Sequence, residues 1–176
     1  KVLKKELADH LTSRRSYLLF SMVYILGFSM AYEAIGGIRS ELQRTGGKSV
    51  FLRLFTTQFG VVPSFLGFLV FFGPLISLIL VFDVINREFS SGTMGNILSQ
   101  PVHRDSVING KFLAGTVTNS LILLSVMILM TGLGIITLGG VPTLEESLRL
   151  SAFFLISLVY LAMWDALGLL FSILFN

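Results

Sequence analysis

Four long apolar stretches separated by polar segments dominate the pattern of the chain. They cover residues 17–35, 61–82, 112–138 and 150–175. A helix needs roughly 20 apolar residues to cross about 30 Å of hydrocarbon, where the backbone must satisfy its own hydrogen bonds. The pattern therefore predicts an all-α, polytopic membrane protein, a transmembrane helix bundle with four spans over residues 17–176.

The four predicted spans differ in their internal features. Pro63 and Pro74 are expected to interrupt the second span, because proline removes a backbone donor and clashes with the preceding turn. The third span contains no charged side chain, and the fourth contains a single acid, Asp165.

Two shorter stretches have one apolar face each. Leu3, Leu7 and Leu11 recur every fourth residue among charged positions, which predicts an amphipathic helix over residues 1–16 lying in the membrane interface. An ordinary solvated helix is the alternative. Four more residues fall on one helical face after the first span and predict a second interfacial helix: Val50, Phe51, Leu54 and Phe55.

Glycines mark the expected turns. Gly36 and Gly37 predict a turn after the first span, and residues 45–47 predict another. Residues 139–142 predict a tight turn between the third and fourth spans. Thr143 followed by Glu146 has the spacing of a capping box, which starts the last helix.

Composition agrees with a bilayer environment. The chain is 53% hydrophobic and 13% charged, against about a quarter charged residues in soluble domains. Its 13 Lys and Arg give a net charge of +3, but they lie mainly between the apolar stretches, so lipid headgroups explain them better than nucleic acid. The absence of Cys excludes disulfides and thiolate metal sites.

The distribution of basic residues predicts the orientation. Eight of the 13 lie in the amino-terminal segment and in the segment after the second span, and five lie on the opposite side. Because cytoplasmic loops carry the excess of Lys and Arg, the amino terminus and residues 83–111 are expected in the cytoplasm. The expected location is the plasma membrane.

The cytoplasmic segment 83–111 is the least membrane-like part of the sequence. Residues 90–92 are expected to end the helix that extends from the second span, Thr93 can cap a new helix, and Pro101 ends it. This predicts a helix of about two turns whose apolar side chains, Met94, Ile97 and Leu98, have no core of their own. Such a short element is suited to a groove on a partner protein.

The same segment resembles a known family, the permease subunits of type-2 ATP-binding-cassette exporters. The resemblance rests on the pattern E-x3-G-T-x4-L-x2-P-x2-R-x6-K, and the residues that carry it are Glu88, Gly92, Thr93, Leu98, Pro101, Arg104 and Lys111. The amino-terminal sequence Lys-Lys-Glu-Leu before the first span also fits this family.

The resemblance implies a mechanical role. Residues 93–99 would be the coupling helix that docks in a cleft of a separate ATPase subunit, with ATP and Mg²⁺ bound by that partner and no cofactor in this chain. It also implies a second permease copy, as a homodimer or heterodimer. The residues expected to couple to the ATPase are Glu88, Gly92, Thr93, Met94, Ile97, Leu98, Pro101 and Arg104. The family has six spans and this sequence predicts four, so either two helices follow at the carboxyl end or the protein is a shortened relative.

Several polar residues elsewhere in the sequence are candidate sites. The position of Asp165 inside the last span is energetically unfavourable for a charged side chain, since inserting a charge at mid-membrane costs about 3 kcal/mol on insertion scales. Asp165 is expected to be protonated, to pair within the bundle or to line a cavity, and a substrate or proton role stays open. Glu33 and Asp83 are expected at span ends, where water hydrates them. Lys111 and Arg104 are expected to anchor their helix at lipid headgroups.

Other motifs favour structure over chemistry. Gly47-Lys48-Ser49 ends like a phosphate-binding loop, but Leu42 stands where the first glycine is required. His10 and His103 lack neighbours at metal-ligand spacing. Helix packing is the expected role of two sets of residues: Gly110, Ala114 and Thr118, and the phenylalanines 65, 68, 71 and 72.

Three functional hypotheses remain from the sequence. The first is a transport permease without enzymatic activity of its own. The second is a membrane anchor or assembly subunit that binds a cytoplasmic partner through the same segment. The third, an intramembrane enzyme using Asp83 and Asp165, lacks a nucleophile or paired-acid motif.

Overall fold

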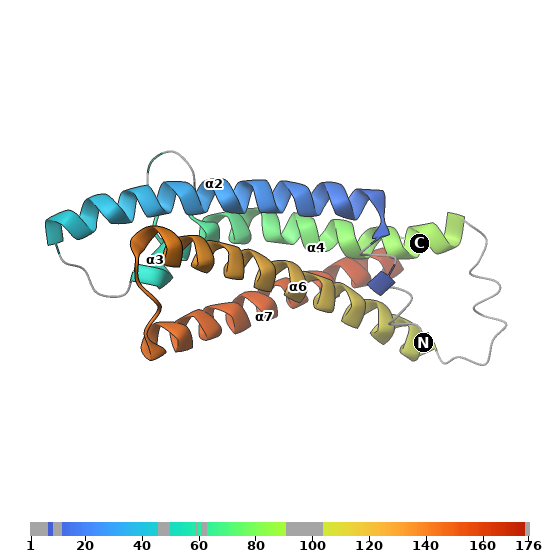
Figure 1. Ribbon diagram of the computed structural model, residues 1–176. Coiled ribbons are helices and arrows are strands. Elements are labelled where there is room, and N and C mark those ends of the chain that lie inside the picture. The colour runs from blue at the N-terminus through green and yellow to red at the C-terminus, as the bar shows by residue number, and fades with distance from the viewer. Residues whose placement is uncertain are drawn as a thin grey trace. The chain divides into compact units, whose positions relative to one another are not determined.

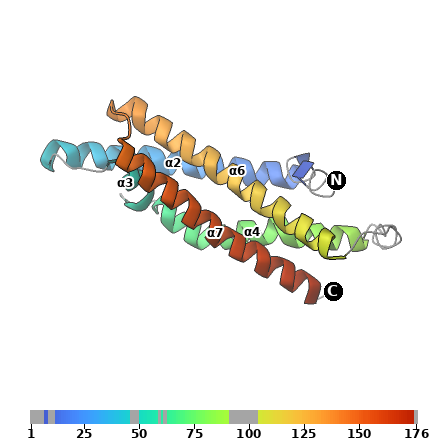
Figure 2. The same cartoon turned by 90° about the horizontal axis from the view of Figure 1, so that it is seen from below.

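The structure, a computed structural model, describes residues 7–8, 12–45, 50–58, 60, 63–90 and 104–174. All regular structure in these residues is helical, as the sequence predicted. The helices are α2 (Arg14–Thr45), α3 (Val50–Thr56), α4 (Phe65–Ser90), α6 (Arg104–Leu138) and α7 (Leu144–Leu174). Figure 1 labels them in chain order, and Figure 2 gives a second view of the same helices.

Three of these helices contain stretches long and apolar enough to cross a membrane. Within the described residues these are Ser16–Ser40, Ile108–Leu138 and Leu144–Ser172, and α4 adds a shorter apolar stretch, Phe65–Val81. The four predicted spans therefore correspond to α2, α4, α6 and α7. The last span begins six residues earlier than the predicted boundary at 150.

The helices contribute to two compact units. Unit 1 comprises Lys1–Leu18, Gly73–Leu121 and Leu158–Asn176, and unit 2 comprises Leu19–Phe72 and Ile122–Ser157. Unit 1 thus takes the later parts of α4 and α7 and the first part of α6. Unit 2 takes nearly all of α2, the whole of α3 and the remaining parts of α4, α6 and α7.

The core of unit 2 is aromatic and centres on α3. The Phe55 ring is fully buried and contacts the rings of Phe65 and Phe153 at centroid distances of 5.9 and 5.6 Å. Phe51 and Leu54 are buried beside it. The apolar face predicted for this helix therefore packs on protein, because such a face can be covered by protein as well as by lipid.

Close helix contacts build unit 1. Gly110, Ala114 and Thr118 are all buried, which confirms their predicted packing role. Val81 and Leu169 form a buried cluster with Phe112 against it. The predicted role of the phenylalanines holds for Phe65 and Phe68, which are buried in unit 2, but Phe71 is 74% exposed and lies outside the core.

Two predicted breaks do not occur. Helix α2 runs through Gly36 and Gly37 as far as Thr45, and α4 contains Pro74 in its interior. In an apolar environment, backbone N–H and C=O groups that leave the helix find no water to hydrogen-bond. A helix therefore continues through glycine and proline residues that would end it in water. Pro63 precedes α4 and does not interrupt it.

The turn between α6 and α7 is confirmed. The backbone of Gly139 has a positive φ of 74°, and its N–H donates to the carbonyl oxygen of Ile135 at 3.1 Å, a glycine cap of α6. Thr143 then caps α7, as its spacing from Glu146 predicted. The Glu146 N–H donates to Thr143 Oγ1 at 3.3 Å, and the Thr143 N–H donates to Glu146 Oε2 at 3.0 Å.

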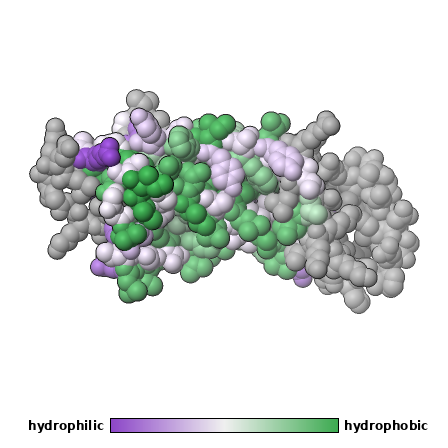
Figure 3. Space-filling view, in the orientation of Figure 1, coloured by the Kyte–Doolittle hydropathy of each residue, from purple (hydrophilic) through white to green (hydrophobic). Residues whose placement is uncertain are grey.

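Apolar side chains cover much of the described surface. Figure 3 shows them on the face in view. The side chains of Tyr32, Phe71, Ile136, Ile156 and Val159 are each more than 70% exposed. Surfaces of this kind on long apolar helices fit contact with lipid acyl chains.

Candidate functional site

The predicted ATPase-coupling residues fall largely outside the described part of the chain. This applies to Gly92, Thr93, Met94, Ile97, Leu98 and Pro101. Glu88 belongs to α4, and Arg104 is the first residue of α6. Both helices therefore continue from their apolar stretches into the predicted segment 83–111, with residues 83–90 and 104–111 helical.

A buried polar cluster lies in unit 1 around Asp165. Asp165 and Ser77 are fully buried, and Asn119 is 2% exposed. Asn119 Nδ2 donates to Asp165 Oδ1 at 2.9 Å and Oδ2 at 3.1 Å, and it also lies 3.0 Å from Ser77 Oγ. Thr116 Oγ1 donates to Oδ2 at 3.3 Å. The cluster joins α4, α6 and α7 through hydrogen bonds of polar side chains.

The geometry favours the structural alternative for Asp165. An amide nitrogen has two hydrogens, so its three contacts require one of them to be shared between acceptors. Both carboxylate oxygens of Asp165 accept at least one bond. Ser77 Oγ in turn donates to the carbonyl oxygen of Leu161 at 3.5 Å. Interhelical hydrogen bonds of this kind contribute on the order of 1 kcal/mol each in membranes.

The sequence indicated Asp165 but not its partners. Asn119, Thr116 and Ser77 are uncharged and lie within apolar runs, where one polar residue among many apolar ones gives little signal. For Thr118, the neighbour of Asn119, the sequence predicts only a role in helix packing. The signal that could have indicated an interhelical hydrogen bond is Asn119 itself, an amide side chain in a predicted span that contains no charged residue.

Glu33, which the sequence predicts at the end of a span, lies inside an apolar stretch of α2. Helix α2 continues for twelve residues beyond it, and Glu33 lies within the apolar stretch Ser16–Ser40. Its Oε2 atom is buried without a hydrogen-bond partner. An unsatisfied buried acceptor costs about 1–3 kcal/mol, and more when charged.

Lys111 also differs from its expectation. Its side chain is 4% exposed within unit 1. A lysine that extended its ammonium group to lipid headgroups would be exposed at its tip, so the prediction of a headgroup anchor at this position is wrong.

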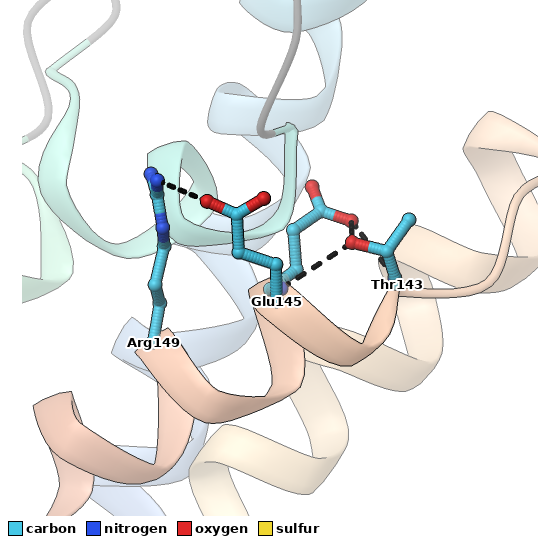
Figure 4. Close-up of polar contacts among 4 residues, drawn as sticks. Thr143, Glu145 and Arg149 are labelled. Atoms are coloured by element: carbon cyan, nitrogen blue, oxygen red, sulfur yellow. Dashed lines mark hydrogen bonds and ion pairs between the residues drawn. The ribbon is translucent and has the colours of Figure 1, made fainter.

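Glu146 joins two helices in unit 2. Besides forming the capping box with Thr143, it accepts a hydrogen bond at Oε1 from the backbone N–H of Phe51 in the first turn of α3, at 3.4 Å. It is 7% exposed. The neighbouring Glu145 instead pairs with Arg149 at the surface. Figure 4 shows the pair of Glu145 with Arg149 and the capping contacts of Thr143 at the start of α7.

Comparison with known proteins places these features in a family. The family model described as "ABC-2 family transporter protein" matches residues 1–176, the whole of this chain. The chain is also 29% identical over 175 residues to the "Probable ABC transporter permease protein NosY" of Pseudomonas aeruginosa. The match covers 95% of this chain and 58% of that relative, so the chain spans little more than half of the relative's length.

The family match covers every helix described above and the segment between α4 and α6. It agrees with the resemblance found in the motif from Glu88 to Lys111. This multi-pass helical membrane protein belongs to the ABC-2 transporter family.

Proposed function

We propose that the chain is the permease subunit of an ATP-driven exporter, powered by a separate ATPase that docks on residues 93–99. The observation that carries the proposal is the position of the motif. It begins in the last turns of α4 and ends in the first turns of α6, and both helices contain apolar stretches. A partner that moves this segment would move both spans, so force would pass without chemistry in this chain.

The proposal includes a dimer of permeases and an amino terminus in the cytoplasm. ABC-2 membership and the name of the permease relative support an ATPase partner. The excess of basic residues on the side of residues 83–111 supports the orientation. Closure of two ATPase subunits would tilt the spans and open the permease to the other side of the membrane.

Co-purification tests the partner. Deleting residues 93–99, or changing Glu88→Ala, is expected to reduce recovery of the ATPase with the intact permease at least tenfold. Glu145→Gln is the matched control, because this acid is exposed at 74% in unit 2. Equal recovery with the deletion variant would contradict docking at this segment.

Labelling tests the orientation and separates transport from anchoring. The chain has no Cys, so single cysteines report one position each. Val141→Cys, at a position 75% exposed, should react with an impermeant maleimide from outside intact cells, and Ser99→Cys only after permeabilisation. A transporter should change its labelling rate at Val141→Cys when ATP is added to the complex, whereas an anchor should not.

A further inference from the structure

The last span, α7, has no direct connection in the chain to the predicted coupling segment. Residues 93–99 follow α4 and precede α6, so a movement of this segment acts on those two helices first. Helix α7 begins only after the turn that ends α6. The later part of α7 can therefore follow the segment directly only through contacts between helices.

Hydrogen bonds around Asp165 supply such contacts. Asn119 Nδ2 on α6 donates to both carboxylate oxygens of Asp165 on α7, at 2.9 and 3.1 Å, and lies 3.0 Å from Ser77 Oγ on α4. The Ser77 hydroxyl group also donates to the carbonyl oxygen of Leu161, which links α4 to α7 a second time. These bonds among Ser77, Asn119 and Asp165 form a tie between three helices.

The tie lies at a similar depth on both helices that flank the segment. Ser77 is thirteen residues before the end of α4, and Asn119 is fifteen residues after the start of α6. At a rise of about 1.5 Å per residue, each lies roughly 20 Å along its helix from the end that adjoins the segment. The tie and both of these helix ends belong to unit 1. One compact unit therefore contains the whole route from the segment to α7.

Two glycines bring the three helices into close contact beside the tie. A Cβ atom on Gly115 of α6 would lie 3.0 Å from Val81 Cγ2 of α4. A Cβ atom on Gly168 of α7 would lie 3.2 Å from Leu78 Cδ2 and 3.7 Å from Leu78 Cα of α4. Residues without side chains let helix backbones approach closely in membranes. This packing leaves little room for α6 or α7 to slide along α4.

Directional bonds and close packing together fix one helix against another. Apolar contacts alone would avoid the cost of burying an acid in a span, whereas a hydrogen bond specifies the depth and rotation of the helices that share it. We propose that Asp165 and Asn119 are positioning residues that make α7 move together with α4 and α6 when the ATPase moves the coupling segment. The inference rests on the proposed function and assigns neither a proton nor a substrate to Asp165.

Two labelling positions in unit 1 separate the movement of α6 from that of α7. Ile108, near the start of α6, is 39% exposed, and Leu174, at the end of α7, is 67% exposed. Because the chain has no Cys, Ile108→Cys and Leu174→Cys each report one helix. N-ethylmaleimide, which enters the bilayer, is the reagent for the complex with its ATPase in lipid nanodiscs. With no other change in the permease, ATP should alter the labelling rate at both positions.

Replacing Asn119 then tests the tie. Asn119→Ala should abolish the response to ATP at Leu174→Cys and preserve it at Ile108→Cys, with the ATPase still co-purifying. Asn119→Leu, which removes the donor but keeps most of the volume, should do the same and replaces the Ala variant if that variant does not fold. Thermal unfolding verifies the fold of each variant.

An exchange of the two side chains separates a tie from acid chemistry. Asn119→Asp combined with Asp165→Asn keeps an amide facing a carboxylate, so it should restore the response at Leu174→Cys. Tyr24→Phe is the matched control, because it removes a different bond of α6, the 2.5 Å contact between the Tyr24 and Ser125 hydroxyl groups in unit 2. It should leave both responses intact.

The outcomes distinguish this inference from the proposed function. A response at Leu174→Cys that survives the loss of Asn119, or that is missing while Ile108→Cys responds in the otherwise unmodified permease, would overturn the inference alone. So would an exchange that fails to restore the response, since the acid would then be needed at position 165 itself, and so would loss of both responses in the Asn119 variants. No ATPase bound, or no response at either position before Asn119 is changed, would overturn the proposed function and this inference with it.

Discussion

The Asn119 amide nitrogen lies within 3.1 Å of both carboxylate oxygens of Asp165, joining α6 to α7 in the interior of unit 1. Both residues are almost fully buried. Acids within spans are commonly functional, yet this one is engaged on both oxygens. Its arrangement therefore gives a direct prediction about stability.

Replacing Asn119 by Ala should destabilise unit 1 by about 1–3 kcal/mol, because the Asp165 carboxylate would lose its main donor while remaining buried. Asn109→Ala is the matched control, since Asn109 is exposed on the same helix. Thermal unfolding in detergent measures both. If Asp165→Ala abolishes most of the effect of Asn119→Ala in a double-mutant cycle, the two side chains are coupled; additive effects would refute the coupling.

Glu146→Ala should destabilise unit 2 by about 1–2 kcal/mol, the usual effect of losing a helix cap. It should also accelerate hydrogen exchange at the Phe51 amide, whose N–H donates to Glu146. Glu145→Gln is the control, because its exposed pair with Arg149 contributes only about 0.3–0.5 kcal/mol. Unchanged exchange at Phe51 would contradict the link between α7 and α3.

Two glycines of α6 should respond oppositely to alanine. A Cβ atom on Gly134 would lie 2.7 Å from Leu54 Cδ1 and 3.3 Å from a Phe51 ring atom. Gly134→Ala should therefore lower the melting temperature, as overpacking costs about 1–3 kcal/mol. Gly132→Ala meets nothing within 4 Å and should be neutral or stabilise by up to about 1 kcal/mol. Equal melting temperatures for the two variants would show that α3 does not pack on Gly134.

Phe55→Ala should cost about 3–5 kcal/mol, because it removes a fully buried ring that contacts Phe65 and Phe153. Phe71→Ala removes the same side chain from a position that is 74% exposed and should cost far less. Chemical unfolding of both variants compares them directly. A small effect at Phe55 would imply that the core of unit 2 lies elsewhere.

The sequence predicted the spans because hydrophobic length is a sufficient signal for a helix in lipid. It also predicted the cap at Thr143, whose spacing from Glu146 is purely local. It failed at Gly36, Gly37 and Pro74, where the environment overrides residues that break helices in water. For α3, the apolar face of Phe51, Leu54 and Phe55 was correct, but the pattern does not say whether lipid or protein covers it.

The candidate sites were harder to predict, for a physical reason. Asp165 stands out by its charge, but its partners Ser77 and Asn119 come from other helices and become neighbours only after folding. Glu33 lies near the glycine pair, and the wrong turn prediction there placed the acid in water. The position of the Glu33 carboxylate inside a helix can be inferred only when α2 is known to continue to Thr45.

The contact between Glu146 and the first turn of α3 has a consequence for agents that approach this end of unit 2. The described part of α3 is poorly accessible to a protease or an antibody. Its side chains Phe51, Leu54 and Phe55 are buried, and its first turn is hydrogen-bonded to Glu146. The turn before α7 offers more, because Val141 and Leu144 are 75% and 82% exposed. Limited digestion of the folded protein should therefore cut at this turn before it cuts within α3.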